Sequence, residues 1–349
     1  MPRSTMPPRT IRTPVAAAAF VLLIGACSSG SSSSAPEGDE SSGEPVAADC
    51  DPARPANPGT DDRVFDHGGT EREYALSVPD GYTGEAEVPM IVNLHGLSST
   101  IDEQDAVSDF PHRAGDRGYV VVTPQALPVA LPVGENGALE ETLFWNMAAA
   151  TSQGDTALDA DDDSDFIERL VASVEDELCI DPGRLFVSGL SNGAGMTMAL
   201  ACDPDSRFAA AAPVAGVNMT NVCPAPGPVS TVAFHGDVDD AVDYAGGNVA
   251  GFDLGNPGVE ERMNELAAVG GCDDTATVER PFDDVEVRTW ENCTDGTDVV
   301  LYTVVGGGHT WPGLTTYYDE PVGAAGQTTS IIATDEILDF FDAHSVPTG

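Results

Sequence analysis

The stretch RLFVSGLSNGAGMTMALAC, from Arg184 to Cys202, decides the fold of this chain. Its apolar run at residues 185–187 is typical of a buried strand, and residues 192–201 are typical of a helix of small and apolar residues. Between them stands Gly189-Leu190-Ser191-Asn192-Gly193, a G-x-S-x-G sequence. Two flanking glycines permit a turn sharp enough to hold the serine out as a nucleophile. The plainer alternative is a glycine-rich turn without chemistry.

Strand and helix patterns alternate along the rest of the chain. We expect strands at residues 72–78, 88–94, 119–123, 184–188, 208–214, 229–234, 285–290 and 299–305, and helices at 104–116, 164–178, 192–201, 259–269 and 334–344. Most of these strands are continuous apolar runs, which predicts an α/β fold with a mostly parallel sheet covered by helices on both faces. Long stretches without pattern follow three strands, at residues 124–163, 237–257 and 311–329. Sites in open α/β sheets lie at such carboxyl ends.

The chain is strongly acidic. It has 349 residues and a formal net charge of −44, and all 14 basic residues are arginine. Such a surface repels phosphates and anionic lipid heads, so nucleic acid and a charged membrane surface are poor partners. The acidic residues are spread along the chain, which favours a solvated acidic surface, as a high-salt habitat would also select.

The N-terminus has the features of a targeting segment. Three arginines precede an apolar run over Val15–Ile24, which is too short to span a bilayer permanently. It ends in Leu23-Ile24-Gly25-Ala26-Cys27, which resembles the lipobox of bacterial lipoproteins, where the cysteine becomes lipidated. We therefore expect a signal peptide at residues 1–26, a flexible tether at 27–49, and one folded domain at 50–349. An ordinary secretory signal is the alternative.

Six cysteines remain after Cys27, an even number that suggests three disulfides in an exported protein. The simplest local pairing joins Cys202 to Cys223 and Cys272 to Cys293. It leaves Cys50 with Cys179. No cysteine or histidine spacing suggests a zinc site, and no cofactor is implied.

A nucleophilic serine needs a base and an orienting acid. Among the six histidines, His309 alone follows the last predicted strand and precedes the closing helix, the order found in α/β-hydrolases. The acid should follow the strand that ends near His235. Asp237, Asp239 and Asp240 are all candidates there, and the residues alone do not choose among them.

Other features near these positions allow two interpretations each. The N–H groups of Leu97 and Asn192 could form an oxyanion hole, although Leu97 could equally lie in a plain turn. Trp145 and Trp311 could line an acyl pocket or simply pack. The run Asp159, Asp161, Asp163 and Asp165 lacks the glycine and glutamate of a calcium loop, so capping of a helix explains it better than a metal.

Taken together, these motifs resemble those of the secreted esterase family that contains polyhydroxybutyrate depolymerases and feruloyl and acetylxylan esterases. The motifs that carry the resemblance are Leu94-His95-Gly96, Phe144-Trp145-Asn146, Cys179-Ile180-Asp181-Pro182, Gly189 to Gly193, Ala211 to Gly216, and Gly308 to Gly313. The family's acid loop reads His-Gly-x-x-Asp, and this resemblance selects Asp239. It implies an α/β-hydrolase fold and a catalytic set of Ser191, Asp239 and His309. One departure is Gly193-Ala194-Gly195, where the family usually has two glycines together.

The resulting hypothesis is an exported, lipid-anchored serine carboxylester hydrolase without a cofactor. Its partners would be the membrane, through the anchor only, and an ester: a small ester, an acyl group on polysaccharide, or a polyester. Two alternatives remain: a serine peptidase of similar fold, and a binding lipoprotein with an inactive site.

Overall fold

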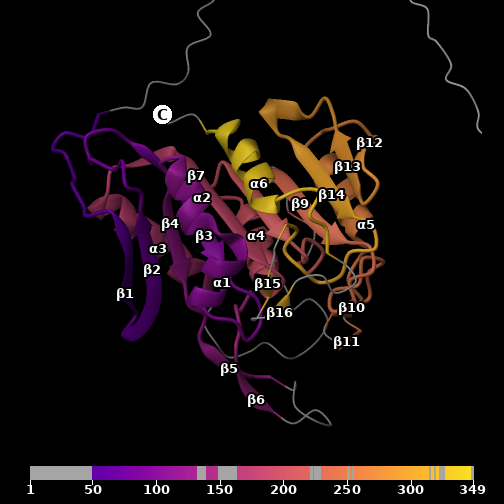
Figure 1. Cartoon of the computed structure of the whole chain (residues 1–349), viewed down its shortest axis with the longest axis horizontal. Coiled ribbons are helices and arrows are strands. Elements are labelled where there is room, and N and C mark those ends of the chain that lie inside the picture. Colours follow the sequence, from indigo (N-terminus) through magenta and orange to yellow (C-terminus); the bar gives the residue numbers. More distant parts are fainter. Residues whose placement is uncertain are drawn as a thin grey trace, which may run out of the picture. The chain divides into compact units, whose positions relative to one another are not determined.

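A ten-stranded sheet forms the centre of the computed structural model, in the order β1-β2-β4-β3-β7-β8-β9-β14-β13-β12 (Figure 1). Its strands are β1 (Gly59–His67), β2 (Thr70–Val78), β3 (Val88–Leu94), β4 (Val120–Pro124), β7 (Ile180–Leu190), β8 (Ala210–Val214), β9 (Ser230–Gly236), β12 (Thr277–Phe282), β13 (Val285–Trp290) and β14 (Val299–Val304). The central six, from β4 to β14, run parallel, and the outer strands on both sides pair antiparallel. This arrangement confirms the mostly parallel sheet expected from the apolar runs.

The structure describes residues 49–131, 139–147, 163–220, 223, 229–249, 252–253, 255–313, 316–317, 320–321 and 327–346. All of them fall within one compact unit, Val46–Gly349. The signal peptide, Cys27 and nearly all of the tether expected from the sequence lie outside these residues. No helix within the described ranges is long and apolar enough to cross a membrane.

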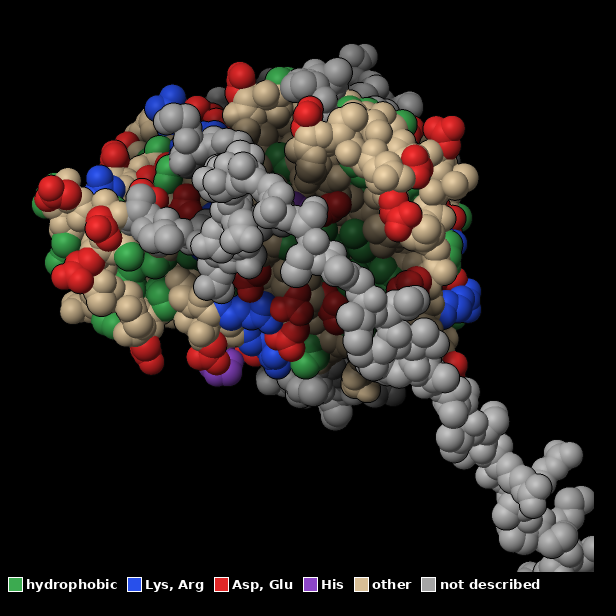
Figure 2. Space-filling model, turned by 90° about the horizontal axis from the view of Figure 1, so that it is seen from above, with side chains coloured by type: hydrophobic (Ala, Val, Ile, Leu, Met, Phe, Trp, Pro, Cys, Tyr) green, Lys and Arg blue, Asp and Glu red, His purple; other side chains and the backbone are tan. Residues whose placement is uncertain are grey.

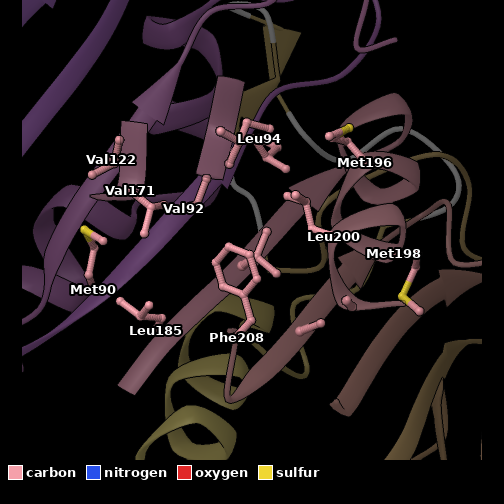
Figure 3. Packing of buried hydrophobic residues seen from close by; sticks show 14 of the residues in the cluster. Met90, Val92, Leu94, Val122, Val171, Leu185, Met196, Met198, Leu200 and Phe208 are labelled. Carbon is pink, nitrogen blue, oxygen red and sulfur yellow. The ribbon is translucent and has the colours of Figure 1, made fainter. Parts of the chain in front are cut away.

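Helices cover both faces of the sheet. They are α1 (Ile101–Ser108), α2 (Phe110–Asp116), α3 (Asp163–Glu177), α4 (Asn192–Ala201), α5 (Val259–Val269) and α6 (Ala333–Asp342). One buried cluster joins α3, α4 and α5 to one sheet face, and a second joins α1, α2 and α6 to the other. In the first cluster, Val92 on β3, Val171 on α3 and Leu200 on α4 point into one shared apolar layer (Figure 3). Apolar burial on both faces stabilises the sheet.

Apart from short ribbons in the loops, the structure differs from the sequence expectation in three elements. A single helix was expected at residues 104–116, but Asp109 takes a left-handed conformation (φ 54°) and divides it into α1 and α2. Pro111, which lies in the first turn of α2, suits a new helix start. The edge strands β1 and β12 were not expected, because most of their residues are exposed and lack an apolar run.

Three disulfides join Cys50 to Cys179, Cys202 to Cys223, and Cys272 to Cys293, the pairing expected from the spacing. Disulfides form and persist in oxidising compartments. The first of them ties the segment before β1 to the residue before β7, 129 positions away.

Three small two-stranded ribbons extend the loops at the carboxyl edge of the parallel strands. They pair β5 (Pro128–Leu131) with β6 (Glu140–Leu143), β10 (Asn248–Val249) with β11 (Phe252–Asp253), and β15 (Thr316–Tyr317) with β16 (Glu320–Pro321). Figure 1 shows them at the lower end of the sheet, after β4, β9 and β14. These are the loops in which the sequence placed the candidate site.

Candidate active site

Ser191 stands at the turn between β7 and α4 in a conformation that L-amino acids rarely adopt, with φ 57° and ψ −117°. The turn is tightly enclosed. A Cβ on Gly189 would lie 2.6 Å from the carbonyl carbon of Gly193 and 2.7 Å from Leu94 O, and one on Gly193 would lie 2.6 Å from His95 O. Only glycine fits at both positions, so the glycine spacing produces the sharp elbow expected from the sequence. Strain of this kind is typical of functional sites.

The sequence predicts an oxyanion hole from the N–H groups of Leu97 and Asn192, and the segments that carry these residues lie beside this serine. Asn192 opens α4, where the N–H groups of the first turn have no partner within the helix. Leu97 follows Gly96, and a Cβ on Gly96 would lie 3.5 Å from the Cβ of Ser191. The turn after β3 and the start of α4 therefore meet at Ser191, as an oxyanion hole requires.

The side chains around this turn hold it in place. Trp145 N donates to Asn192 Oδ1 (2.7 Å), and the indole N–H of Trp145 donates to His95 O (2.9 Å). The ring of His95 is fully buried, its Nδ1 lies 2.7 Å from Gly96 O, and its Nε2 accepts from Ala126 N (3.0 Å). Burial lowers the pKa of His95 to about 4, so the ring stays neutral above that pH. Sequence reasoning assigned no role to His95, which acts here by fixing the turn that precedes Leu97.

The structure brings together Asp239 and His309, the residues that the sequence predicts as acid and base. His309 Nδ1 lies 2.8 Å from Asp239 Oδ2, and the side chain of Asp239 is fully buried while that of His309 keeps 20% exposure. Burial raises the pKa of Asp239, but hydrogen bonds from His235 and His309 outweigh it and leave the pKa well below its ordinary value. The carboxylate is therefore ionised at every pH near neutrality.

The neighbouring aspartates do not reach the histidine. Asp237 Oδ1 accepts from Gly306 N (2.6 Å), so this residue links the acid loop to the start of the histidine loop. Asp240 is exposed. Asp239 differs because its Oδ1 accepts from the N–H groups of Ala241 and Val242, 2.9 Å each, in a turn that directs Oδ2 to His309.

Strand order brings the three groups to one edge of the sheet. Ser191 follows β7, Asp239 follows β9 and His309 follows β14, and these strands lie together in the order β7-β8-β9-β14. A Cβ on Gly236 would meet the carbonyls of Gly307 and Gly308, so the acid and histidine loops are in close contact. No hydrogen bond joins Ser191 Oγ to His309 within the described residues. Such bonds are often long in enzymes without substrate.

The contacts of the two candidate substrate-binding tryptophans are those of packing residues. Trp145 and Trp311 are buried to 0% and 1% exposure. The indole N–H of Trp311 donates to Thr334 Oγ1 (3.0 Å), and its ring meets the edge of Phe110. With both ring systems enclosed by protein and both N–H groups satisfied, these side chains stabilise the loops that carry the site.

Two aspartates of the acidic run, Asp163 and Asp165, lie in the first turn of α3 and make structural contacts. Asp163 pairs with the buried Arg72 at 2.8 Å, and its Oδ2 accepts from Asn146 N at 2.8 Å. Asp165 pairs with Arg169 at 2.7 Å. The remaining aspartates of the run, Asp159 and Asp161, lie outside the described residues. Within the part of the chain that the structure describes, no three His, Cys, Asp or Glu side chains are grouped so as to hold a metal ion.

The strand order and the helices on both faces are those of an α/β-hydrolase fold. The solved acetyl xylan esterase from Aspergillus awamori superposes with a TM-score of 0.52, covering 81% of this chain and 98% of that one at 16% identity. At that identity the likeness concerns the fold alone. It agrees with the mostly parallel sheet and helices on both faces.

The chain belongs to the esterase family, whose model matches residues 67–244, about half of the chain. The match includes Ser191 and Asp239, whereas His309 lies beyond it.

Two relatives are feruloyl esterases of fungi. Feruloyl esterase B of Piromyces equi is 28% identical over 246 residues, which are 68% of this chain but only 42% of that protein. Feruloyl esterase D of Neurospora crassa is 26% identical over 246 residues, covering 69% of this chain and 74% of that protein. The similarity to the first relative thus concerns less than half of its length.

Proposed function

We propose that this protein hydrolyses carboxylic esters through an acyl-enzyme formed on Ser191. The observation that carries the proposal is the buried Asp239 carboxylate, 2.8 Å from His309 Nδ1, at the sheet edge where Ser191 stands on a strained elbow. An ionised acid holds the base in the tautomer that leaves Nε2 free to accept a proton.

The reaction proceeds in two halves. His309 Nε2 takes the proton of Ser191 Oγ, which attacks the ester carbonyl, and the N–H groups of Leu97 and Asn192 stabilise the oxyanion. Collapse of this intermediate releases the alcohol, which receives the proton from His309. Water, deprotonated by His309, then attacks the acyl group, and the second intermediate collapses to release the carboxylic acid as His309 returns the proton to Ser191 Oγ. Asp239 stays ionised throughout and stabilises the histidine when it is charged.

The substrate we propose is an uncharged ester. It is either a small ester or a polysaccharide that carries an esterified acyl group such as feruloyl or acetyl. The feruloyl esterases among the relatives support the aromatic acyl group, and the family resemblance also includes polyesters. The formal charge of −44 disfavours anionic esters. Figure 2 shows acidic side chains spread over one face of the molecule, with fewer basic ones among them.

We further propose that the protein is exported and held to the outer face of the membrane by a lipid on Cys27. Three disulfides in the described domain support export. Replacing Cys27 by Ser should release the protein into the medium with unchanged esterase activity. Full release of the unaltered protein, with Cys27 unacylated, would contradict the anchor but not the chemistry.

A substrate panel tests the proposed activity. Purified protein is offered p-nitrophenyl acetate and butyrate, methyl ferulate, acetylated xylan, a polyhydroxybutyrate film, a peptide p-nitroanilide and an anionic ester, each at low and high salt. Hydrolysis of esters that is lost in Ser191→Ala supports the proposal. Cleavage of the peptide amide without any ester would identify a serine peptidase, and no cleavage at all would identify an inactive binding protein.

A further inference from the structure

A second histidine, His235, contacts the buried carboxylate of Asp239. His235, in β9, has a side chain with no exposed surface, and its Nε2 lies 3.3 Å from Asp239 Oδ2. The same nitrogen lies 2.9 Å from the carbonyl oxygen of Val242. Asp239 Oδ2 therefore faces two imidazoles, one from His309 and one from His235.

The contacts fix the protonation of the His235 ring. A carbonyl oxygen only accepts hydrogen bonds, so Nε2 must carry the hydrogen that Val242 O and Asp239 Oδ2 share. Nδ1 is buried and has no hydrogen-bond partner among the described residues. A proton there would leave a buried donor unpaired, which is costly, so the neutral ring with a bare Nδ1 is the form that fits. The ring's other neighbour is the edge-on aromatic ring of Tyr244, 5.8 Å away between centroids.

The Nε2–H of His235 contacts both Asp239 and Val242, which are the two ends of the turn that presents the carboxylate. Asp239 Oδ1 is held by the N–H groups of Ala241 and Val242. Among the residues that the structure describes, Oδ2 has no such backbone donor, and its direction depends on the two histidines. Because Val242 O is bound by the same His235 nitrogen, loss of this ring would loosen the carboxylate and the far end of its turn together.

We propose that His235 is a positioning residue that aims the Asp239 carboxylate at His309. The proposal rests on the proposed function of Asp239 as the orienting acid. The described contacts of His235 do not include Ser191, so His235 would act through Asp239. The histidine of the His-Gly-x-x-Asp segment thereby gains a physical role, which the sequence alone did not reveal.

Two substitutions separate positioning from general packing. His235→Leu fills the space of the ring with an apolar side chain and removes the N–H donor. His235→Gln can place an amide N–H near the original Nε2. Since a hydrogen bond to a charged group is lost, His235→Leu should lower kcat by about 10- to 100-fold with little change in KM. His235→Gln should recover most of that loss.

The decisive readout is a double-mutant cycle. If His235 acts through Asp239, then His235→Leu should change kcat less than about threefold when Asp239 is already Asn, because the two effects share one mechanism. A merely structural role would give the same fold loss in both backgrounds. His344→Leu is the matched control, since that ring also contacts a carbonyl oxygen (Phe340, 2.6 Å) and an aspartate (Asp298, 3.0 Å). Asp298 directly precedes β14, whereas His309 follows the other end of that strand. It should lose thermal stability without losing kcat.

Three results would overturn the proposal. They are an unchanged kcat in His235→Leu, an equal loss in both backgrounds, and a loss in His235→Leu that Gln does not recover in a protein of wild-type melting temperature. If instead Asp239→Asn alone retains full activity, the proposed acid itself is wrong, and the positioning role falls with it. If Asp239→Asn is inactive while both His235 variants are fully active, only the further inference fails.

Discussion

Gly193 offers the most exacting test of the geometry around Ser191, because a single methyl group there would collide with the turn after β3. A Cβ on Gly193 would lie 2.6 Å from His95 O and closer still to Leu94 O, whereas real Cβ atoms essentially never approach within 3.0 Å. Both obstacles are backbone atoms and cannot rotate away. The φ angle of Gly193 is outside the left-handed region, so contact alone opposes the substitution.

Gly193→Ala must therefore push the start of α4 away from the turn that carries Leu97. A displacement approaching 1 Å at a catalytic group can lower the rate by about 100-fold. We expect kcat for p-nitrophenyl acetate to fall by about that factor or more. The far-ultraviolet circular dichroism should stay that of the unaltered fold, because the collision is confined to one turn.

Gly115→Ala is the matched control for this substitution. Gly115 lies in α2, and a Cβ there would meet no atom within 4 Å. This variant should keep full activity and gain up to about 1 kcal/mol of stability from the better helix propensity of alanine. Wild-type kcat in a folded Gly193→Ala protein would show that the elbow at Ser191 and the turn that carries Leu97 are not in close contact.

Three further predictions concern charge and crosslinks. Asp239→Asn should lower kcat by about 10⁴-fold, since the orienting charge is lost. Asp237→Asn keeps its acceptor oxygen for the histidine loop and should lower kcat by less than about tenfold. Steady-state kinetics on one ester decide, and a crippled Asp237→Asn beside an active Asp239→Asn would contradict the assignment of Asp239 as the acid. Burial raises the pKa of Asp105 from 3.8 to about 6, so its ionisation costs stability as the pH rises through that range. Asp105→Asn should therefore raise the melting temperature at pH 7.5 but not at pH 4. An equal gain at both pH values would refute this prediction. Replacing Cys202 and Cys223 by Ala opens a loop of 21 residues and should cost about 3 kcal/mol in denaturant unfolding, so an unchanged midpoint would contradict that role.

The parts of this molecule that follow from local pattern could be predicted from the sequence. The elbow follows from glycines two residues on either side of Ser191, and α4, α5, β3 and β13 have the predicted bounds because apolar periodicity and their flanking residues coincide. The place of His309 follows from chain order.

Other features depend on contacts between distant segments. The strands β1 and β12 were missed because their hydrogen bonds come from neighbours and their side chains are largely exposed. The break at Asp109 depends on a single left-handed residue. The roles of His95 and His235 could not be predicted, because what each ring contacts is decided only when the strand ends meet.

A covalent label shows directly whether Ser191 is the nucleophile and whether His309 activates it. The protein is treated with a fluorophosphonate, digested, and the modified peptide is sequenced by mass spectrometry. We predict one adduct, on Ser191, that forms much more slowly in His309→Ala and in Asp239→Asn and is absent in Ser191→Ala. An adduct on another residue, or labelling of Ser191→Ala at the wild-type rate, would contradict the account.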